Sequence, residues 1–170
     1  MSSSTEPSFT HDPSCDLLLE RLVDVPVELV WKAWTEPEHL KAWFTPRPWQ
    51  TIGCEIDLRP GGKFATVMRD PDGNEYPSVG CYLDVQEPSR LVFTSALHPG
   101  YRPLPPDEDA GLLFTAELAF EPVGESTRYS ARAIHGSRDS AKAHQDMGFL
   151  DGWGSALDQL VEHMTGHANS

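Results

Sequence analysis

The sequence has little of what several large classes of protein require. Lysine and arginine total 13 against 26 aspartate and glutamate in 170 residues, which gives a formal net charge of −13. A surface this acidic repels phosphate backbones and anionic lipids, so neither nucleic acid nor a membrane is expected as a partner. No apolar run approaches the roughly 20 residues that span a bilayer. The first fourteen residues also lack the basic and apolar regions of a signal peptide.

Cysteine is scarce as well. Cys15, Cys54 and Cys81 are an odd number, and no two of them form a C-x-x-C pair. A disulfide framework and a structural zinc site are therefore not expected, and a reducing cytoplasm is the expected location. No internal repeat and no second domain is visible. We expect residues 1–14 to be a disordered tail, 15–165 a single domain and 166–170 a frayed C-terminus.

The N-terminal part of the domain predicts one strand and two short helices. Residues 16–23 are apolar-rich and end before Pro26, as a strand would. The segment 35–38 has the T-x-x-E form of a capping box and predicts the start of a second short helix, which ends before Pro46. Between them an apolar stripe at helical spacing predicts the first helix; its members are Val27, Val30, Trp31 and Trp34.

From residue 49 to 133 the pattern is that of antiparallel strands. Short segments rich in Gly, Pro and Asp separate the apolar-rich runs, as tight turns do. The connection 98–111 contains four prolines and predicts a functional or disordered loop. The predicted strands cover residues 49–58, 63–69, 76–85, 90–96, 113–120 and 128–133.

The last segment, 140–163, predicts one long amphipathic helix. Its apolar side gathers Phe149, Leu150, Trp153, Leu157, Leu160, Val161 and Met164. The apolar face must be buried against the sheet. The fold class is therefore α+β: a curved antiparallel sheet of about six to seven strands wrapped around a long C-terminal helix, with two short helices after the first strand. Such a sheet tends to leave a cavity under the helix.

Four stretches of the chain carry a resemblance to a known family. They are Asp24-x-Pro26-x-Glu28-x-Val30-Trp31-x-Ala33-Trp34-Thr35-x-Pro37-Glu38-x-Leu40-x-x-Trp43; Asp57-x-Arg59-Pro60-Gly61-Gly62-x-Phe64; Asp72-Gly73 and Gly80 with Glu87-Pro88-x-Arg90-Leu91-Val92-Phe93-Thr94; and His144-x-x-Met147-Gly148-Phe149-x-x-Gly152-Trp153-x-x-x-Leu157-Asp158-x-Leu160. Over about residues 17–164 the chain resembles the START-like helix-grip superfamily (SRPBCC, with the Bet v-like fold). Within it, the chain is most similar to the branch named after the activator of heat shock protein 90 ATPase, also called polyketide cyclase-like.

This resemblance implies a cavity for a small molecule between the sheet and the C-terminal helix. Members of the superfamily bind lipids, polyketides, hormones or other apolar ligands, and a few catalyse cyclisation or dehydration in the cavity. The resemblance to the chaperone activator does not extend to that protein's N-terminal chaperone-binding domain. Fold alone does not decide among these activities.

Aromatic and small residues are the main candidates for the cavity wall. Trp31 and Trp34 are expected in the core. Gly148, Gly152 and Gly154 each mark either a close backbone approach or room for a ligand, and a bulky residue at Gly152 should harm stability or ligand uptake. The predicted cavity residues are Trp43, Phe44, Phe64, Met68, Tyr82, Phe93, Phe114, Phe149, Gly152 and Trp153.

Acid–base chemistry has only weak candidates: His98, His135 and Glu20. His144 falls on the polar side of the predicted helix and is expected to face solvent. No nucleophile–base–orienter triad is recognisable, and neither a catalytic residue, a metal site nor a cofactor is predicted.

Three functions therefore remain open at the level of sequence. The first is binding of a small apolar or amphipathic ligand in the cavity. The second is a polyketide cyclase or aromatase-like enzyme, which would need an acid or base on the cavity wall. The third is a module that stimulates a chaperone ATPase. The residues do not indicate an oligomeric state.

Overall fold

The computed structural model describes residues 12–108 and 111–168. The elements, in chain order, are β1 (Asp16–Val23), α1 (Val27–Thr35), α2 (Pro37–Trp43), β2 (Gln50–Ile56), β3 (Lys63–Arg69), β4 (Glu75–Gln86), β5 (Arg90–Thr94), β6 (Leu97–His98), β7 (Arg102–Pro103), β8 (Thr115–Val123), β9 (Ser126–Ile134), α3 (Arg138–Asp146) and α4 (Phe149–Ala168). Among the described helices none is long and apolar enough to cross a membrane.

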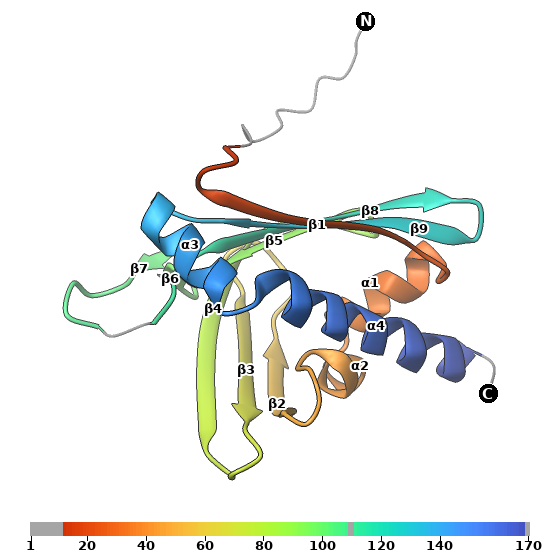
Figure 1. Ribbon diagram of the computed structural model, residues 1–170, viewed down its shortest axis with the longest axis horizontal. Coiled ribbons are helices and arrows are strands. Elements are labelled where there is room, and N and C mark those ends of the chain that lie inside the picture. The colour runs from red at the N-terminus through yellow and green to blue at the C-terminus, as the bar shows by residue number, and fades with distance from the viewer. Residues whose placement is uncertain (1–11, 109–110, 169–170) are drawn as a thin grey trace, which may run out of the picture.

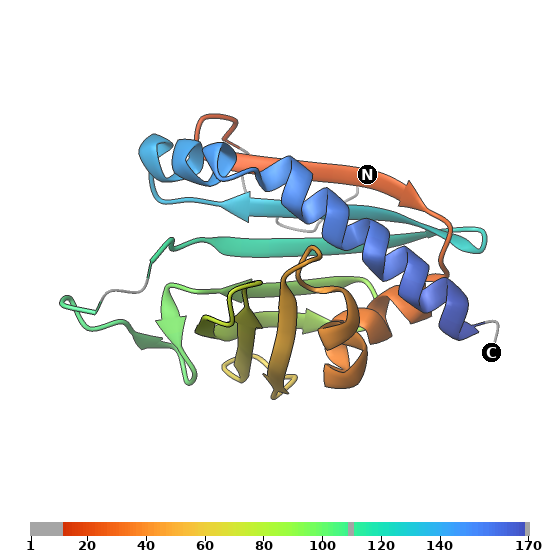
Figure 2. The same ribbon diagram turned by 60° about the horizontal axis from the view of Figure 1, so that its bottom comes forward.

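One antiparallel sheet carries the fold. Its strand order is β1-β9-β8-β5-β4-β3-β2, while β6 and β7 form a separate hairpin. Helix α4 crosses one face of this sheet, and α1 and α2 cover the same face beside the C-terminal half of α4 (Figures 1 and 2). The α+β helix-grip prediction is confirmed. The hairpin occupies part of the connection for which the sequence predicted only a loop.

Part of the predicted N-terminal tail and part of the predicted frayed C-terminus lie within the described residues. Of the predicted tail 1–14, residues 1–11 lie outside the described residues. Residues 12–14 form a turn in which the Asp12 carbonyl accepts the N–H groups of Cys15 and Asp16 at 2.9 and 2.8 Å. At the other end, α4 continues through Gly166 to Ala168.

The predicted single helix over 140–163 is wrong in one respect: it is two helices. α3 ends at Asp146, and Gly148 has a φ of 91°. L-residues with a side chain avoid this conformation, whereas glycine adopts it freely. The chain changes direction at Gly148, so the side chains of α3 face a different direction from the one that a continuous helix would give them.

The predicted capping box is also wrong. Thr35 is still the last residue of α1, and its hydroxyl donates to the Trp31 carbonyl one turn earlier at 2.7 Å. Glu36 is the residue between the two helices, with extended φ and ψ, and Pro37 begins α2. Proline fits there because its missing N–H has no partner in a first helical turn.

The core lies between the sheet and the helices. In the second half of α4, Leu157, Leu160 and Met164 are each at most 1% exposed. Helix α4 contacts β1, α1 and α2, and these three side chains belong to the same buried core as residues of β8 and β9. This half of the interface is closed by large aliphatic side chains.

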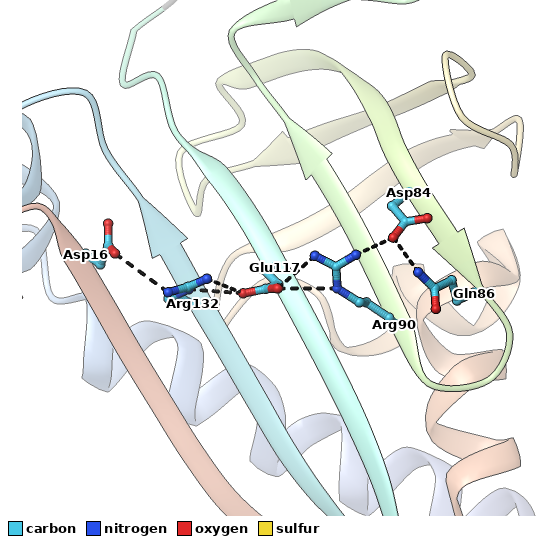
Figure 3. Close-up of polar contacts among 6 residues, drawn as sticks. All are labelled: Asp16, Asp84, Gln86, Arg90, Glu117 and Arg132. Atoms are coloured by element: carbon cyan, nitrogen blue, oxygen red, sulfur yellow. Dashed lines mark hydrogen bonds and ion pairs between the residues drawn. The ribbon is translucent and has the colours of Figure 1, made fainter. Parts of the chain in front are cut away.

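Charged side chains form a row across the opposite face of the sheet (Figure 3). Glu117 on β8 accepts from Arg132 on β9 at 2.6 Å and from Arg90 on β5 at 2.9 Å. Arg90 also pairs with Asp84 on β4, and Arg132 lies 3.9 Å from Asp16 on β1. Charges alternate in sign from strand to strand, which stabilises the packing of neighbouring strands.

Glycine replacements test the break between α3 and α4. Gly148→Ala places a side chain at a φ of 91° and should lower the free energy of unfolding by about 1–2 kcal/mol. Gly152→Ala, in the regular part of α4 where an added Cβ meets nothing within 4 Å, should instead raise it by up to about 1 kcal/mol. Urea denaturation of both variants measures this, and equal effects of the same sign would contradict it.

A second pair of variants tests the row of charges. Glu117→Ala leaves two arginines without their shared carboxylate, of which Arg132 is 8% exposed, and should lower the unfolding free energy by about 2–4 kcal/mol. Glu121→Ala is the matched control, because Glu121 lies on the same strand and pairs with Arg128 at the surface. Its loss should stay below about 1 kcal/mol. Similar losses in the two variants would show that the row contributes little.

Candidate functional site

A cavity of about 360 Å³ lies between the sheet, α2 and the junction of α3 with α4. Its walls are mostly aromatic and aliphatic, as ligand pockets usually are. The lining residues are Trp34, Trp43, Phe44, Thr45, Pro46, Met68, Leu112, Phe114, Tyr129, His144, Met147, Gly148, Phe149, Gly152, Trp153 and Ala156.

Most of the residues that the sequence suggested for a cavity wall do meet in this place. They are Trp43, Phe44, Met68, Phe114, Phe149, Gly152 and Trp153. Phe64, Tyr82 and Phe93 do not line the cavity. They pack against one another in the core, with ring centroids 5.5 Å apart for Phe64 and Tyr82 and 4.7 Å for Phe64 and Phe93. Two lining residues contact this cluster: Phe44 lies 5.9 Å from Phe64, and Trp34 lies 6.0 Å from Phe93, between ring centroids. The cluster therefore lies behind the wall.

Small residues keep the first half of α4 from filling the space beneath it. Gly148, just before α4, and Gly152 and Ala156 within it all line the cavity. Gly152 and Ala156 are four residues apart and so share one side of the helix. An added Cβ at Gly152 meets no atom within 4 Å. Gly154 has a different role, because a Cβ there would lie 2.7 Å from the guanidinium of Arg21.

Two of the three tryptophans in the wall, Trp34 and Trp43, have a paired indole N–H. Trp34 Nε1 donates to the Tyr129 hydroxyl at 3.0 Å, and Trp43 Nε1 donates to the Ala33 carbonyl at 3.0 Å. The indole rings meet edge to face, with centroids 4.9 Å apart. They therefore present carbon surface to the cavity. Trp34, which the sequence assigned to the core, is 2% exposed and belongs both to the core and to the cavity wall.

One side chain of α4 holds the rim of the cavity. The rim is the segment 44–46 that follows α2 and contributes Phe44, Thr45 and Pro46 to the lining. Gln159 Nε2 donates to the carbonyls of Trp43 and Thr45 at 3.0 and 2.9 Å, and its Oε1 accepts from the Arg47 N–H at 2.9 Å. The rim is thus tied to the half of α4 that packs tightly.

His144 lines the cavity, and a second histidine, His135, lies behind it. His135 Nε2 lies 2.9 Å from His144 Nδ1, and the two residues are 5% and 7% exposed. Phe114 and Phe149 pack against the His144 ring at centroid distances of 4.8 and 5.1 Å. Burial, and then the neighbouring His135, lower the pKa of His144 to about 4.

The expectation that His144 faces solvent is therefore wrong. It rested on a continuous helix over 140–163, and the break at Gly148 turns α3 so that His144 points inward. The sequence did carry a signal for this break, because a glycine after the last residues of a helical pattern commonly ends a helix.

The other acid–base candidates lie elsewhere. Glu20 is exposed on β1, on the face of the sheet away from α4. His98 belongs to the β6–β7 hairpin and pairs with Glu108 at 2.8 Å. His135 is near the cavity but is not among its lining residues; it contacts the cavity through His144. Within 12–108 and 111–168 no group of three side chains is arranged to hold a metal ion.

The lowered pKa of His144 predicts an acid-sensitive contribution to stability. A histidine in the unfolded chain titrates near about 6.5, whereas the folded value is about 4. The unfolded state therefore binds more protons between these values. The stabilisation is fully present above pH ~6.5 and is lost as the pH falls toward about 4.

We expect the stability lost between pH 7 and pH 4 to be about 1–3 kcal/mol smaller in His144→Phe than in the unaltered protein. Urea denaturation at a series of pH values measures this loss. Carboxylates titrate in the same range in both proteins, so only the difference between the two curves reports on His144. Parallel curves would contradict the prediction.

Comparison with known proteins places the chain in a family. The family model described as Activator of Hsp90 ATPase homolog 1-like protein matches residues 24–165. The search of curated proteins gives no match. The crystal structure of protein NE0264 from Nitrosomonas europaea is 45% identical, with a TM-score of 0.88 over 94% of this chain and 100% of that one.

More distant structures share the fold. A protein from Arthrobacter aurescens is 22% identical, with a TM-score of 0.77 over 94% of this chain and 92% of that one. The AHSA1 protein SPO3351 from Silicibacter pomeroyi is 22% identical, with a TM-score of 0.67 over 89% of this chain and 99% of that one. From the family match and the similarity to the Nitrosomonas protein, this chain belongs to the family of Activator of Hsp90 ATPase homolog 1-like proteins.

Proposed function

We propose that this protein binds a small apolar or amphipathic molecule in the cavity between the sheet and the α3–α4 junction. The observation that carries the proposal is the cavity of about 360 Å³ with aromatic walls. Burial of apolar ligand surface in such a space contributes about 25 cal/mol per Å² before the costs of association. The hydrogen bonds of Gln159 to the rim and the paired indole N–H groups of Trp34 and Trp43 support a site that is formed before the ligand binds.

A polyketide cyclase-like enzyme is the second candidate. The observation that favours it is His144, a histidine on the cavity wall with a second histidine behind it. A general base works best with a pKa near the working pH, and a pKa of about 4 makes His144 a weak base at neutral pH. Binding is therefore the better supported proposal. It also accounts for the open cavity, which stimulation of a chaperone ATPase would not require.

The proposal is tested by filling the cavity from α4. Gly152→Leu places a side chain in the space where a Cβ meets no atom. We expect it to weaken binding of the neutral dye N-phenyl-1-naphthylamine, followed by its fluorescence, by about tenfold or more. The melting temperature should not fall, because leucine favours a helix over glycine by roughly 0.8 kcal/mol.

Gly166→Leu is the matched control. Gly166 lies on the same helix, outside the cavity lining, and a Cβ there also meets no atom within 4 Å. The control should bind the dye as the unaltered protein does. Failure of the unaltered protein to bind the dye, or equal binding by Gly152→Leu, would overturn the proposal.

A further inference from the structure

A backbone carbonyl fixes which ring nitrogens of His135 and His144 carry hydrogen. His135 Nδ1 lies 2.8 Å from the carbonyl oxygen of Cys15. A carbonyl oxygen only accepts, so Nδ1 carries the hydrogen of this bond. A neutral imidazole has one N–H, which leaves His135 Nε2 as an acceptor.

The hydrogen position on His135 in turn fixes the hydrogen position on the His144 ring. His135 Nε2 lies 2.9 Å from His144 Nδ1, and because Nε2 accepts, Nδ1 of His144 donates. The remaining nitrogen, Nε2 of His144, then has a lone pair and no hydrogen. The Cys15 carbonyl, although outside the cavity, thus sets the hydrogen-bonding character of a group on its wall.

This nitrogen belongs to a residue that lines the cavity, and it has no hydrogen-bond partner among the described residues. The residue as a whole is 7% exposed. Within the described part of the chain, the only fully enclosed side-chain polar atom without a partner is the Tyr82 hydroxyl oxygen. Nε2 of His144 is therefore unpaired but not enclosed. The His144 ring lies among three aromatic side chains of the cavity wall, those of Phe114, Phe149 and Trp153, at centroid distances of 4.8, 5.1 and 6.3 Å.

The rest of the wall is electrically neutral. None of its lining residues carries a carboxylate, an ammonium or a guanidinium group. The other lining side chains with polar atoms are Thr45, Tyr129 and the tryptophans. The Tyr129 hydroxyl accepts from Trp34 and has its own proton left to donate. Burial raises the pKa of Tyr129, so this hydroxyl stays protonated. An ion in this cavity would lose its hydration without gaining an opposite charge.

We propose that the ligand of this cavity is a neutral hydroxylated aromatic, or a molecule of similar flat apolar shape, whose hydroxyl donates to Nε2 of His144. The proposal rests on the proposed function and adds the ligand's chemical class. A hydroxyl supplies the donor that Nε2 lacks. A carboxylate, which only accepts, would set its lone pairs against that of Nε2. An ether of the same shape would leave Nε2 unsatisfied.

A matched set of naphthalenes tests this. Their affinities are measured at pH 7 by displacement of N-phenyl-1-naphthylamine and by calorimetry. In the unaltered protein 1-naphthol should bind about fivefold more tightly than 1-methoxynaphthalene, which keeps the ring and the oxygen but lacks the proton. 1-Naphthoate should bind more weakly than either. In His144→Phe the preference for naphthol over its methyl ether should disappear.

His98→Phe is the matched control, because His98 lies in the β6–β7 hairpin and outside the cavity lining. This variant should keep the preference for naphthol. If the dye binds but the preference is absent, or is the same in His144→Phe, the inference about the ligand fails while the proposed function stands. If no dye binds, both fail.

A measurement on the unaltered protein avoids dependence on a variant that folds poorly. Long-range ¹H–¹⁵N NMR distinguishes protonated from bare imidazole nitrogens. We expect His144 to carry its proton on Nδ1, and its Nε2 resonance to shift with 1-naphthol but not with 1-methoxynaphthalene. A proton on Nε2 of His144 in the free protein would overturn the proposal.

Discussion

Helix α4 crosses a twisted sheet, and the side chains of one helix cannot meet such a surface equally along twenty residues. The second half of α4 meets it with Leu157, Leu160 and Met164, and packs closely. The first half, which Gly148 precedes, presents Gly152 and Ala156 at the corresponding positions and leaves a space. One half of α4 thus contributes close packing, and the other half leaves room for the cavity. Gln159, in the second half, ties the rim of the cavity to the part of the helix that packs closely.

The cavity differs in electrostatic character from the rest of the molecule. The chain has a formal charge of −13, and charged side chains are paired on the outer face of the sheet, as in the row from Asp84 to Asp16. The cavity wall, in contrast, offers an unprotonated imidazole nitrogen and a phenolic hydroxyl. An interior of this kind selects a ligand by shape and by one or two hydrogen bonds, because no charge is available to dominate the interaction. The acidic exterior acts only on the encounter.

The fold and much of the cavity wall could be predicted from the sequence because both depend on local patterns. Alternation along the strands, the proline and glycine of the turns and the apolar stripe of the last segment each require only nearby residues. The depth of a residue below the surface is not local. Phe64, Tyr82 and Phe93 are aromatic like the residues of the wall, but they lie behind it, and Phe64 contacts the rim residue Phe44.

The histidine pair shows a second reason why the sequence did not predict the whole site. A helical wheel assigns faces only while the helix continues, and the positive φ of Gly148 ends it. His144 was therefore placed on the wrong side. No periodicity indicates that His135 and the Cys15 carbonyl would meet it, because β1 and β9 bring those groups together from opposite ends of the chain.

That pairing of β1 with β9 also has a consequence for the order in which the protein is assembled. Asp16 pairs with Ile134 and Val23 with Thr127, so the strand that pairs with β1 comes more than 100 residues later in the chain. A ribosome releases β1 first and β9 near the end, and the intervening loop must close before the pair forms. Until then Leu18 and Leu22 lie on an unpaired strand, and the carbonyl that orients the cavity histidines is out of reach. Because His144 lies on α3, which follows β9, the hydrogen-bonding pattern of the cavity is completed only when β9 and α3 are both in place. A nascent chain that has formed β2 to β8 still lacks it.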